Sequence, residues 1–193
     1  MSVTSLSDSE MAAVSSSTHF DLFDLPRSFD VELGLLDRNY RALQRSVHPD
    51  RFVNASDQER RVSMQRATQI NEGYETLKDP LKRGRYLLEL DGRVHDDERN
   101  TNSDMKFLME QMELREALGE IRGREDAMQE LGRIMDRIAA DIDKLVGDLR
   151  DQFARADAES LDAAADTLTR MQFFRRLQEE AGELEADLED ELA

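Results

Sequence analysis

The sequence has no cysteine, and this absence excludes several kinds of chemistry at once. Without thiols the chain has no disulfide, no thiolate ligand for zinc and no cysteine nucleophile. This composition fits a reducing compartment, and we expect a cytoplasmic protein. No apolar run approaches the about 18 residues that a membrane helix requires, so no membrane partner is expected. The N-terminus lacks the basic start and apolar core of a secretory signal, and no arginine precedes Arg27.

Residues that break helices are also scarce. The 193 residues include 9 glycines and 3 prolines, which favours long helices. Hydrophobic residues make up 39% and charged residues 36%, a balance typical of a helix-rich chain with a modest core. No segment shows the alternation of a strand. We therefore predict an all-α protein of one domain or two small ones.

Charge is unevenly distributed along the chain. Residues 24–90 contain 12 Lys or Arg and 11 Asp or Glu, a net charge of +1. Residues 91–193 contain 14 Lys or Arg and 29 Asp or Glu, a net charge of −15. The first 23 residues carry the remaining net charge of −3. This asymmetry predicts two modules with different partners. The acidic half argues against nucleic acid as a partner, because phosphates require a basic surface.

The N-terminal part is expected to form a helical hairpin with flanking helices, over residues 19–91. The first long helix is predicted from about Val31 to Val47, with Asp30 as its N-cap. The second is predicted from Asp57, where Ser56-Asp57-Gln58-Glu59 matches a capping box. A shorter helix follows from Pro80 to Leu90. The predicted apolar faces are Leu36, Tyr40, Leu43 and Val47 in the first helix and Met64, Ala67, Ile70, Tyr74 and Leu77 in the second.

The rest of the chain divides into a tail, a linker and a second domain. Residues 1–18 are rich in serine and have no helical period, so we expect a disordered tail. Residues 92–104 are polar and read as a linker. The second domain is expected over residues 105–193, with helices near 105–121, 124–155 and 159–190. Because short turns join these helices, we predict an antiparallel three-helix bundle.

A His48-Pro49-Asp50 tripeptide follows the first long helix directly. Pro49 disfavours helical geometry at His48, so the helix ends there. Asp50 can accept a charge-assisted hydrogen bond, and neutral His48 offers one donor and one acceptor. A basic stripe precedes the tripeptide and suits an acidic partner surface, formed by Arg38, Arg41 and Arg45, with Arg51 beyond it. The alternative is a helix-stopping turn beside a solvated basic face.

These features resemble the J-domain of DnaJ-type co-chaperones. The resemblance also includes the opening Phe20-Asp21-Leu22-Phe23. It implies that residues 19–91 form a J-domain whose partner is an HscA/DnaK-type chaperone. Hydrolysis would then belong to the partner, so we expect no enzyme activity, no catalytic residue and no cofactor. The implied chaperone-binding residues are His48, Pro49, Asp50, Arg38, Arg41, Arg45 and Arg51.

The helix predicted near 105–121 has two apolar patterns. At roughly 100° per residue, Phe107, Leu114, Leu118 and Ile121 share one face, which is the expected core face. A second stripe points away from that face and has acidic neighbours: Leu108, Met109 and Met112, beside Glu113, Glu116 and Glu120. Two interpretations remain open. The stripe packs against another helix or the linker, or it forms an adaptable binding patch, since methionine packs variably.

Two segments resemble the C-terminal domain of the HscB family, the J-proteins of iron–sulfur cluster assembly. They are Phe107-Leu108-Met109-Glu110-Gln111-Met112-Glu113-Leu114-Arg115-Glu116 and Asp162-Ala163-Ala164-Ala165-Asp166. The resemblance implies binding of an IscU-type scaffold, and the alternative is a general J-domain protein or helical adaptor for other clients. The implied scaffold-binding residues are Leu108, Met109, Met112, Glu113, Glu116, Glu120 and Phe173. Phe173 and Phe174 diverge by about 100° on a helix, so one of them is free to face outward, but spacing does not say which.

No metal site is expected. His19, His48 and His95 are the only histidines, and no two share a helix face at ligand spacing. The carboxylates are spread over helix surfaces, and nothing marks a catalytic pair.

Overall fold

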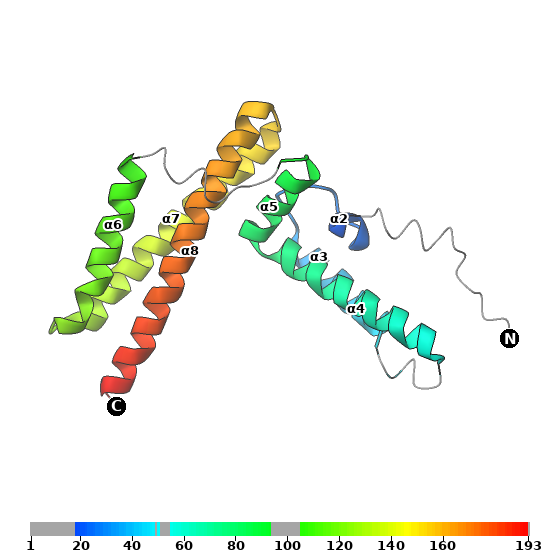
Figure 1. Cartoon of the computed structure of the whole chain (residues 1–193), viewed down its shortest axis with the longest axis horizontal. Helices are drawn as coiled ribbons and strands as arrows, with labels where there is room; N and C mark the ends of the chain where they lie inside the picture. Colours follow the sequence, from blue (N-terminus) through cyan, green and yellow to red (C-terminus); the bar gives the residue numbers. More distant parts are fainter. Residues whose placement is uncertain (1–17, 49, 51–54, 94–104, 193) are drawn as a thin grey trace. The chain divides into compact units, whose positions relative to one another are not determined.

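The protein is all-α in the computed structural model (Figure 1), which describes residues 18–48, 50, 55–93 and 105–192. No strand occurs within these ranges. The expected tail, apart from Thr18, and most of the expected linker lie outside the described residues. The elements in chain order are α2 (His19–Leu22), α3 (Leu33–Ser46), α4 (Asp57–Lys78), α5 (Pro80–Leu90), α6 (Met105–Gly119), the 3-10 helix η2 (Ile121–Gly123), α7 (Ala127–Arg155) and α8 (Ala158–Leu192).

The contacts divide the chain into two compact units, Met1–Arg83 and Gly84–Ala193. The division falls inside α5, whereas the sequence analysis ends the first domain at residue 91. The second half of α5 contacts α8 closely, since a Cβ at Gly84 would lie 2.6 Å from Leu168 Cδ2. Arg85 also donates a hydrogen bond to Gln172. Where the functional domains begin and end stays a prediction.

The first unit is built on the antiparallel helices α3 and α4, which lie side by side in Figure 1. Leu36 of α3 and Leu77 of α4 are completely buried. The rings of Tyr40 and Tyr74 stack with centroids 4.0 Å apart. The Tyr74 hydroxyl donates to Asp37 Oδ1 at 2.8 Å. Polar side chains therefore lock the register of this helix pair in addition to apolar packing.

The short helix α2 packs against α4 through Phe20 and Phe23, which are both 1% exposed. Close approach requires a glycine on α4, because a Cβ at Gly73 would lie 3.0 Å from Phe23 Cε2. Asn39 Nδ2 donates to the Phe23 carbonyl at 2.7 Å and ties α2 to α3. Phe20 and Phe23 are thus part of the core of this unit.

Two details of the predicted hairpin are wrong. Helix α3 begins at Leu33 with Glu32 as N-cap, and the Asp30 N–H donates to Ser28 Oγ in the segment before the helix. Met64 is 71% exposed, and its neighbour Ser63 is buried at 7% exposure. On a helix Ser63 points within roughly 20° of the buried Ile70, whereas Met64 points roughly 120° away. The capping box at the start of α4 is confirmed.

The second unit contains the predicted three-helix bundle of α6, α7 and α8. Helices α7 and α8 form the longest contact, and α6 packs against both. The interior is aliphatic, with Ile138, Leu149 and Leu168 at 0% exposure. The turn between α7 and α8 is made at Ala156, whose φ of 54° places it in the left-handed region that commonly ends a helix.

Candidate functional site

The tripeptide lies where α3 ends. Val47 is the C-cap of α3, and its side chain is buried at 6% exposure. Its carbonyl accepts a hydrogen bond from the Ser63 hydroxyl of α4 at 3.0 Å. The chain therefore leaves the core at a fixed point and turns outward at His48.

His48 and Asp50 form a small exposed polar pair. Their side chains are 59% and 87% exposed. The Asp50 N–H donates to His48 Nδ1 at 3.3 Å, and the carboxylate lies 3.4 Å from the same nitrogen. His48 Nδ1 is therefore engaged within the loop by both the backbone and the side chain of Asp50. The pair presents an imidazole ring and a carboxylate to solvent. Pro49 and Arg51 lie outside the described residues.

The predicted basic stripe runs along the exposed side of α3. Arg38, Arg41 and Arg45 are all exposed and line a shallow depression together with Gly34 and Asp37. Within the described part of the chain, none of the three arginines pairs with a carboxylate. Asp37 is engaged by the Tyr74 hydroxyl instead. The stripe is thus a row of accessible positive charge that ends one turn before His48.

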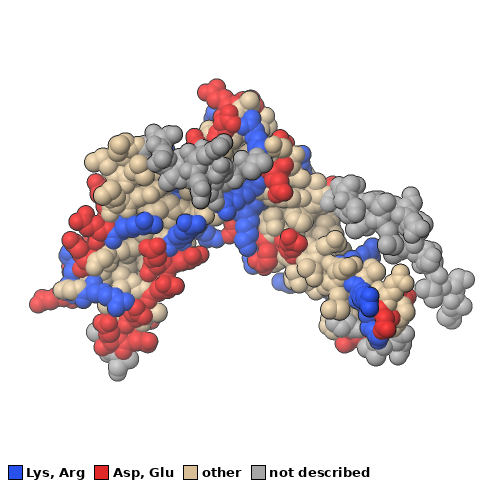
Figure 2. All heavy atoms as spheres, in the orientation of Figure 1, with Lys and Arg blue, Asp and Glu red and all other residues tan. Residues whose placement is uncertain are grey.

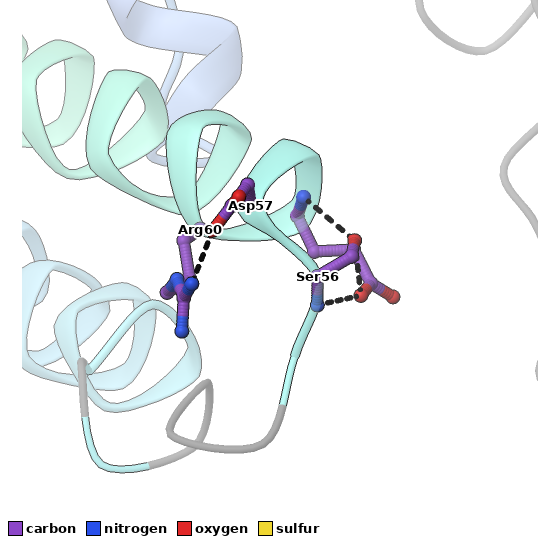
Figure 3. A network of polar contacts seen from close by, with 4 residues as sticks. Ser56, Asp57 and Arg60 are labelled. Carbon is purple, nitrogen blue, oxygen red and sulfur yellow. Dashed lines mark hydrogen bonds and ion pairs between the residues drawn. The ribbon is translucent and has the colours of Figure 1, made fainter.

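A second polar network stands at the start of α4, where the chain re-enters the hairpin (Figure 3). The Glu59 carboxylate accepts the Ser56 N–H and hydroxyl, each at 2.8 Å. These bonds to the ionised form lower the pKa of Glu59 below its ordinary value. Beside them Arg60 pairs with Asp57. Local hydrogen bonds thus fix the point where α4 begins.

The outer face of α6 carries the predicted methionine stripe. Met109 is 58% and Met112 71% exposed, while Leu108 is half-buried beside them. Glu113 and Glu116 are exposed farther along the same helix, and Glu120 is exposed just beyond its end, at the N-cap of η2. Figure 2 shows uncharged surface over the N-terminal end of α6 and acidic side chains along its outer edge beyond it. The face is therefore apolar at one end and acidic at the other.

One further methionine is exposed on α6. Met105, the first residue of α6, is 72% exposed. Its spacing of four from Met109 and seven from Met112 places the three methionines within roughly 60° of one direction. The spacing is visible in the sequence, but Met105 stands at the predicted helix start, outside both predicted stripes.

Phe173 is not on the surface. Phe173 is 8% and Phe174 4% exposed, so neither ring faces outward. Phe107 of α6 contacts both, with ring centroids 5.6 and 6.3 Å away. The Arg115 guanidinium covers the Phe173 ring at 5.6 Å. The expectation of an outward phenylalanine fails because α6 packs over both neighbours. Phe173 supports the helix that carries the stripe.

Metal and membrane sites receive no support from the part of the chain that is described. Among those residues no group of three or more His, Asp or Glu is arranged to hold a metal ion. None of the helices in the same ranges is both long and apolar enough to cross a membrane. The features that remain are the exposed loop and the α6 face.

Known proteins are similar to this chain over most of its length. A co-chaperone protein HscB homolog of Shewanella oneidensis is 41% identical over 172 residues, which cover 89% of this chain and 99% of that protein. The chain belongs to the HscB family of co-chaperones. The family model described as the HSCB C-terminal oligomerisation domain matches residues 103–182.

Solved structures agree with this HscB assignment. Chaperone HscB from Vibrio cholerae is similar with a TM-score of 0.80 and 38% identity, over 89% of this chain and 99% of that one. Human co-chaperone protein HscB gives a TM-score of 0.78 and 34% identity, over 86% of this chain and 81% of that one. The chain therefore has the HscB architecture, a J-like helical domain followed by a helical bundle.

Proposed function

We propose that this HscB-family co-chaperone acts in cytoplasmic iron–sulfur cluster assembly. In this proposal the α6 face binds an IscU-type scaffold, and the loop at His48 stimulates the ATPase of an HscA/DnaK-type chaperone. The chaperone supplies all the hydrolytic chemistry, so the co-chaperone needs neither a cofactor nor a catalytic residue. The observation that carries the proposal is the presence of two exposed surfaces of different chemistry, one on each unit of an HscB-family chain.

The loop has the properties of a contact for a charged protein surface. It offers the His48 imidazole and the Asp50 carboxylate, and a carboxylate forms its strongest hydrogen bonds with a cationic donor such as arginine. Arg38, Arg41 and Arg45 supply positive charge on the approach to it. Exposed charges of this kind steer association with an acidic partner surface. Proline within the tripeptide limits the entropy that docking removes.

The α6 face has the properties of a contact for an apolar segment next to basic residues. Methionine side chains adapt to the shape of a partner, and three of them lie exposed in one row. Glu113 and Glu116 have no ion-pair partner among the described residues, and Glu116 lies in the last turn of α6, near the negative end of the helix dipole. A basic partner would relieve that repulsion. We therefore propose Leu108, Met109, Met112, Glu113, Glu116 and Glu120 as scaffold contacts, with Met105 added and Phe173 as their support.

The chaperone contact is tested by His48→Gln. Glutamine keeps a donor and an acceptor but loses the ring geometry that places the donor. We expect stimulation of the chaperone ATPase to fall at least about tenfold, which corresponds to a loss of about 1.4 kcal/mol in the chaperone contact. Scaffold binding should be unchanged. Scaffold affinity of the same variant is the internal control for folding. Unchanged stimulation would remove the proposed mechanism.

The client contact is tested by Leu108→Ala with Met109→Ala. We expect the scaffold affinity to fall about tenfold or more, because each truncation removes on the order of 1 kcal/mol of apolar contact. Basal stimulation of the chaperone without scaffold should not change. If the protein is instead a general J-domain protein for other clients, the wild type does not bind the scaffold, or the double variant binds it as tightly as the wild type does. Phe173→Ala is unsuitable here because the buried ring also supports the bundle.

A further inference from the structure

Ser63 is one of only four polar or charged side chains that are buried among the described residues. Its hydroxyl donates to the Val47 carbonyl at 3.0 Å, sixteen residues away on the other helix of the hairpin. Val47 is the residue directly before His48. A buried hydroxyl is therefore attached to the last backbone group before the exposed loop.

The acceptor of this hydrogen bond lies on another helix, whereas a serine or threonine hydroxyl within a helix usually bonds to a carbonyl of its own helix. Thr68, five residues farther along α4, donates to the Met64 carbonyl of its own helix at 3.1 Å. That local bond is the common arrangement for serine and threonine in helices. The last carbonyls of a helix lack intrahelical donors. Ser63 supplies such a donor from outside, and it does so at the end of α3 that leads into the loop.

The geometry points to Ser63 as a positioning residue for the His48 loop. The buried Val47 side chain and the Ser63 hydrogen bond together fix where the chain leaves α3. The Ser56–Glu59 capping box fixes where it enters α4 (Figure 3). One serine hydroxyl thus bonds the backbone directly before His48, and another caps the start of α4. This inference rests on the proposed function, because the property being positioned is the chaperone contact.

Loss of the Ser63 hydroxyl should affect affinity more than the maximal rate. Without the bond, the exit direction of the chain varies, and docking must restrict that motion. His48 and Asp50 keep their own chemistry, so the docked complex still activates the chaperone. We expect Ser63→Ala to raise the half-maximal concentration for ATPase stimulation about fivefold, which corresponds to about 1 kcal/mol for one hydrogen bond. Stimulation at saturation should stay within about twofold of wild type.

Asn39→Ala is the matched control. Asn39 also donates to a backbone carbonyl sixteen residues away, that of Phe23 at 2.7 Å, but this bond ties α3 to α2. Both variants remove one bond between side chain and backbone in the same unit. We expect both to lower the melting temperature, and only Ser63→Ala to raise the half-maximal concentration. Ser63→Thr retains the hydroxyl and should restore most of the affinity.

A second measurement keeps the inference testable if alanine unfolds the unit. Ser63→Cys preserves the side-chain volume and offers a weak donor, so its half-maximal concentration should lie between those of wild type and Ser63→Ala. Backbone amide NMR signals of His48 and Asp50 should shift or broaden in the Ser63 variants and remain in place in Asn39→Ala. These signals report on the loop without any chaperone.

The outcomes separate this inference from the proposed function when His48→Gln is assayed in parallel. If His48→Gln abolishes stimulation and Ser63→Ala lowers affinity more than Asn39→Ala, both hold. If His48→Gln abolishes stimulation but Ser63→Ala matches Asn39→Ala in both affinity and loop signals, the positioning role is overturned. If His48→Gln stimulates like wild type, the proposed function fails, and the role assigned to Ser63 fails with it.

Discussion

The two units of this protein present their exposed surfaces in opposite ways. In the first unit, two directional groups, His48 and Asp50, follow a helix end that is held by a hydrogen bond from the other helix of the hairpin. In the second, flexible side chains form a row on a regular helix, with Met105, Met109 and Met112 all more than half exposed. The first arrangement suits a contact with fixed geometry, and the second suits a contact that adapts to its client.

The interiors of the units differ in the same sense. Across the α3–α4 hairpin, the Tyr40 hydroxyl donates to Asn71 at 3.0 Å and the Tyr74 hydroxyl to Asp37 at 2.8 Å. The α7–α8 contact is dominated by aliphatic side chains such as Ile138 and Leu168. The directional bonds fix the register of α3 against α4 and so the position of the loop that follows α3. An aliphatic core is sufficient to keep one face of α6 exposed. The difference leads to four predictions.

The largest effect is expected in the aliphatic core. Ile138→Ala on α7 removes a completely buried side chain and should lower the free energy of unfolding by about 2–5 kcal/mol. Ile142→Ala on the same helix is the control, and its cost should be clearly smaller because Ile142 is only half-buried. Denaturant unfolding followed by circular dichroism measures both. Equal losses would mean that the bundle interior is not organised around Ile138.

Next comes the basic stripe of the first unit. Arg41→Glu reverses one charge beside the loop and should raise the half-maximal concentration for chaperone stimulation about tenfold at low salt, with less effect at high salt. Arg176→Glu, an exposed charge on α8, is the control and should change little. Titration of the ATPase rate at two salt concentrations tests the difference. Similar effects of both reversals would show that net charge matters, and not the stripe.

A smaller effect is expected at the edge of the methionine row. Met105→Ser should weaken scaffold binding about fivefold, since about 1 kcal/mol of apolar contact is lost. Met64→Ser is matched to it, because Met64 is 71% and Met105 72% exposed, and it lies on the other unit. Calorimetric titration with the scaffold provides the affinities. Met105 would not belong to the surface if the two variants bound equally well.

The smallest effect concerns the capping box of α4. Because the pKa of Glu59 is lowered in the folded state, the carboxylate contributes stability above its ordinary pKa of 4.5, and this contribution is lost as the pH falls through the lowered value. In Glu59→Gln the side chain still accepts hydrogen bonds but does not titrate. The stability difference between wild type and variant should therefore shrink below about pH 4.5. A difference that stays constant in thermal melts down to about pH 3 would contradict the assignment.

Much of this organisation was predictable from the sequence because it depends on local rules. The Ser56–Glu59 box, the end of α3 beside Val47 and the core face of Phe107, Leu114, Leu118 and Ile121 all follow from neighbouring residues. The family resemblance is confirmed by the HscB relatives. The residues proposed for binding remain predictions, because comparison and fold do not test them.

What could not be predicted depends on packing between elements. Apolar periodicity predicts Met64 as the buried residue, but Ser63 is buried instead. The group that faces it from α3 is the Val47 carbonyl, which accepts its hydroxyl, and not an apolar side chain. Phe173 and Phe174 are both buried because α6 covers both directions, which spacing on α8 alone does not reveal. Periodicity predicts which face of a helix is apolar, but not how wide a face its neighbours cover.

The central claim is that one chain couples the two surfaces, and mixing two defective variants tests it most directly. His48→Gln keeps the scaffold surface, and Leu108→Ala with Met109→Ala keeps the loop. The measurement is the scaffold-dependent increase in chaperone ATPase rate with each variant and with an equimolar mixture. We predict that the mixture does no better than the individual variants, because delivery and stimulation require the same molecule. Recovery of the wild-type increase by the mixture would contradict that coupling.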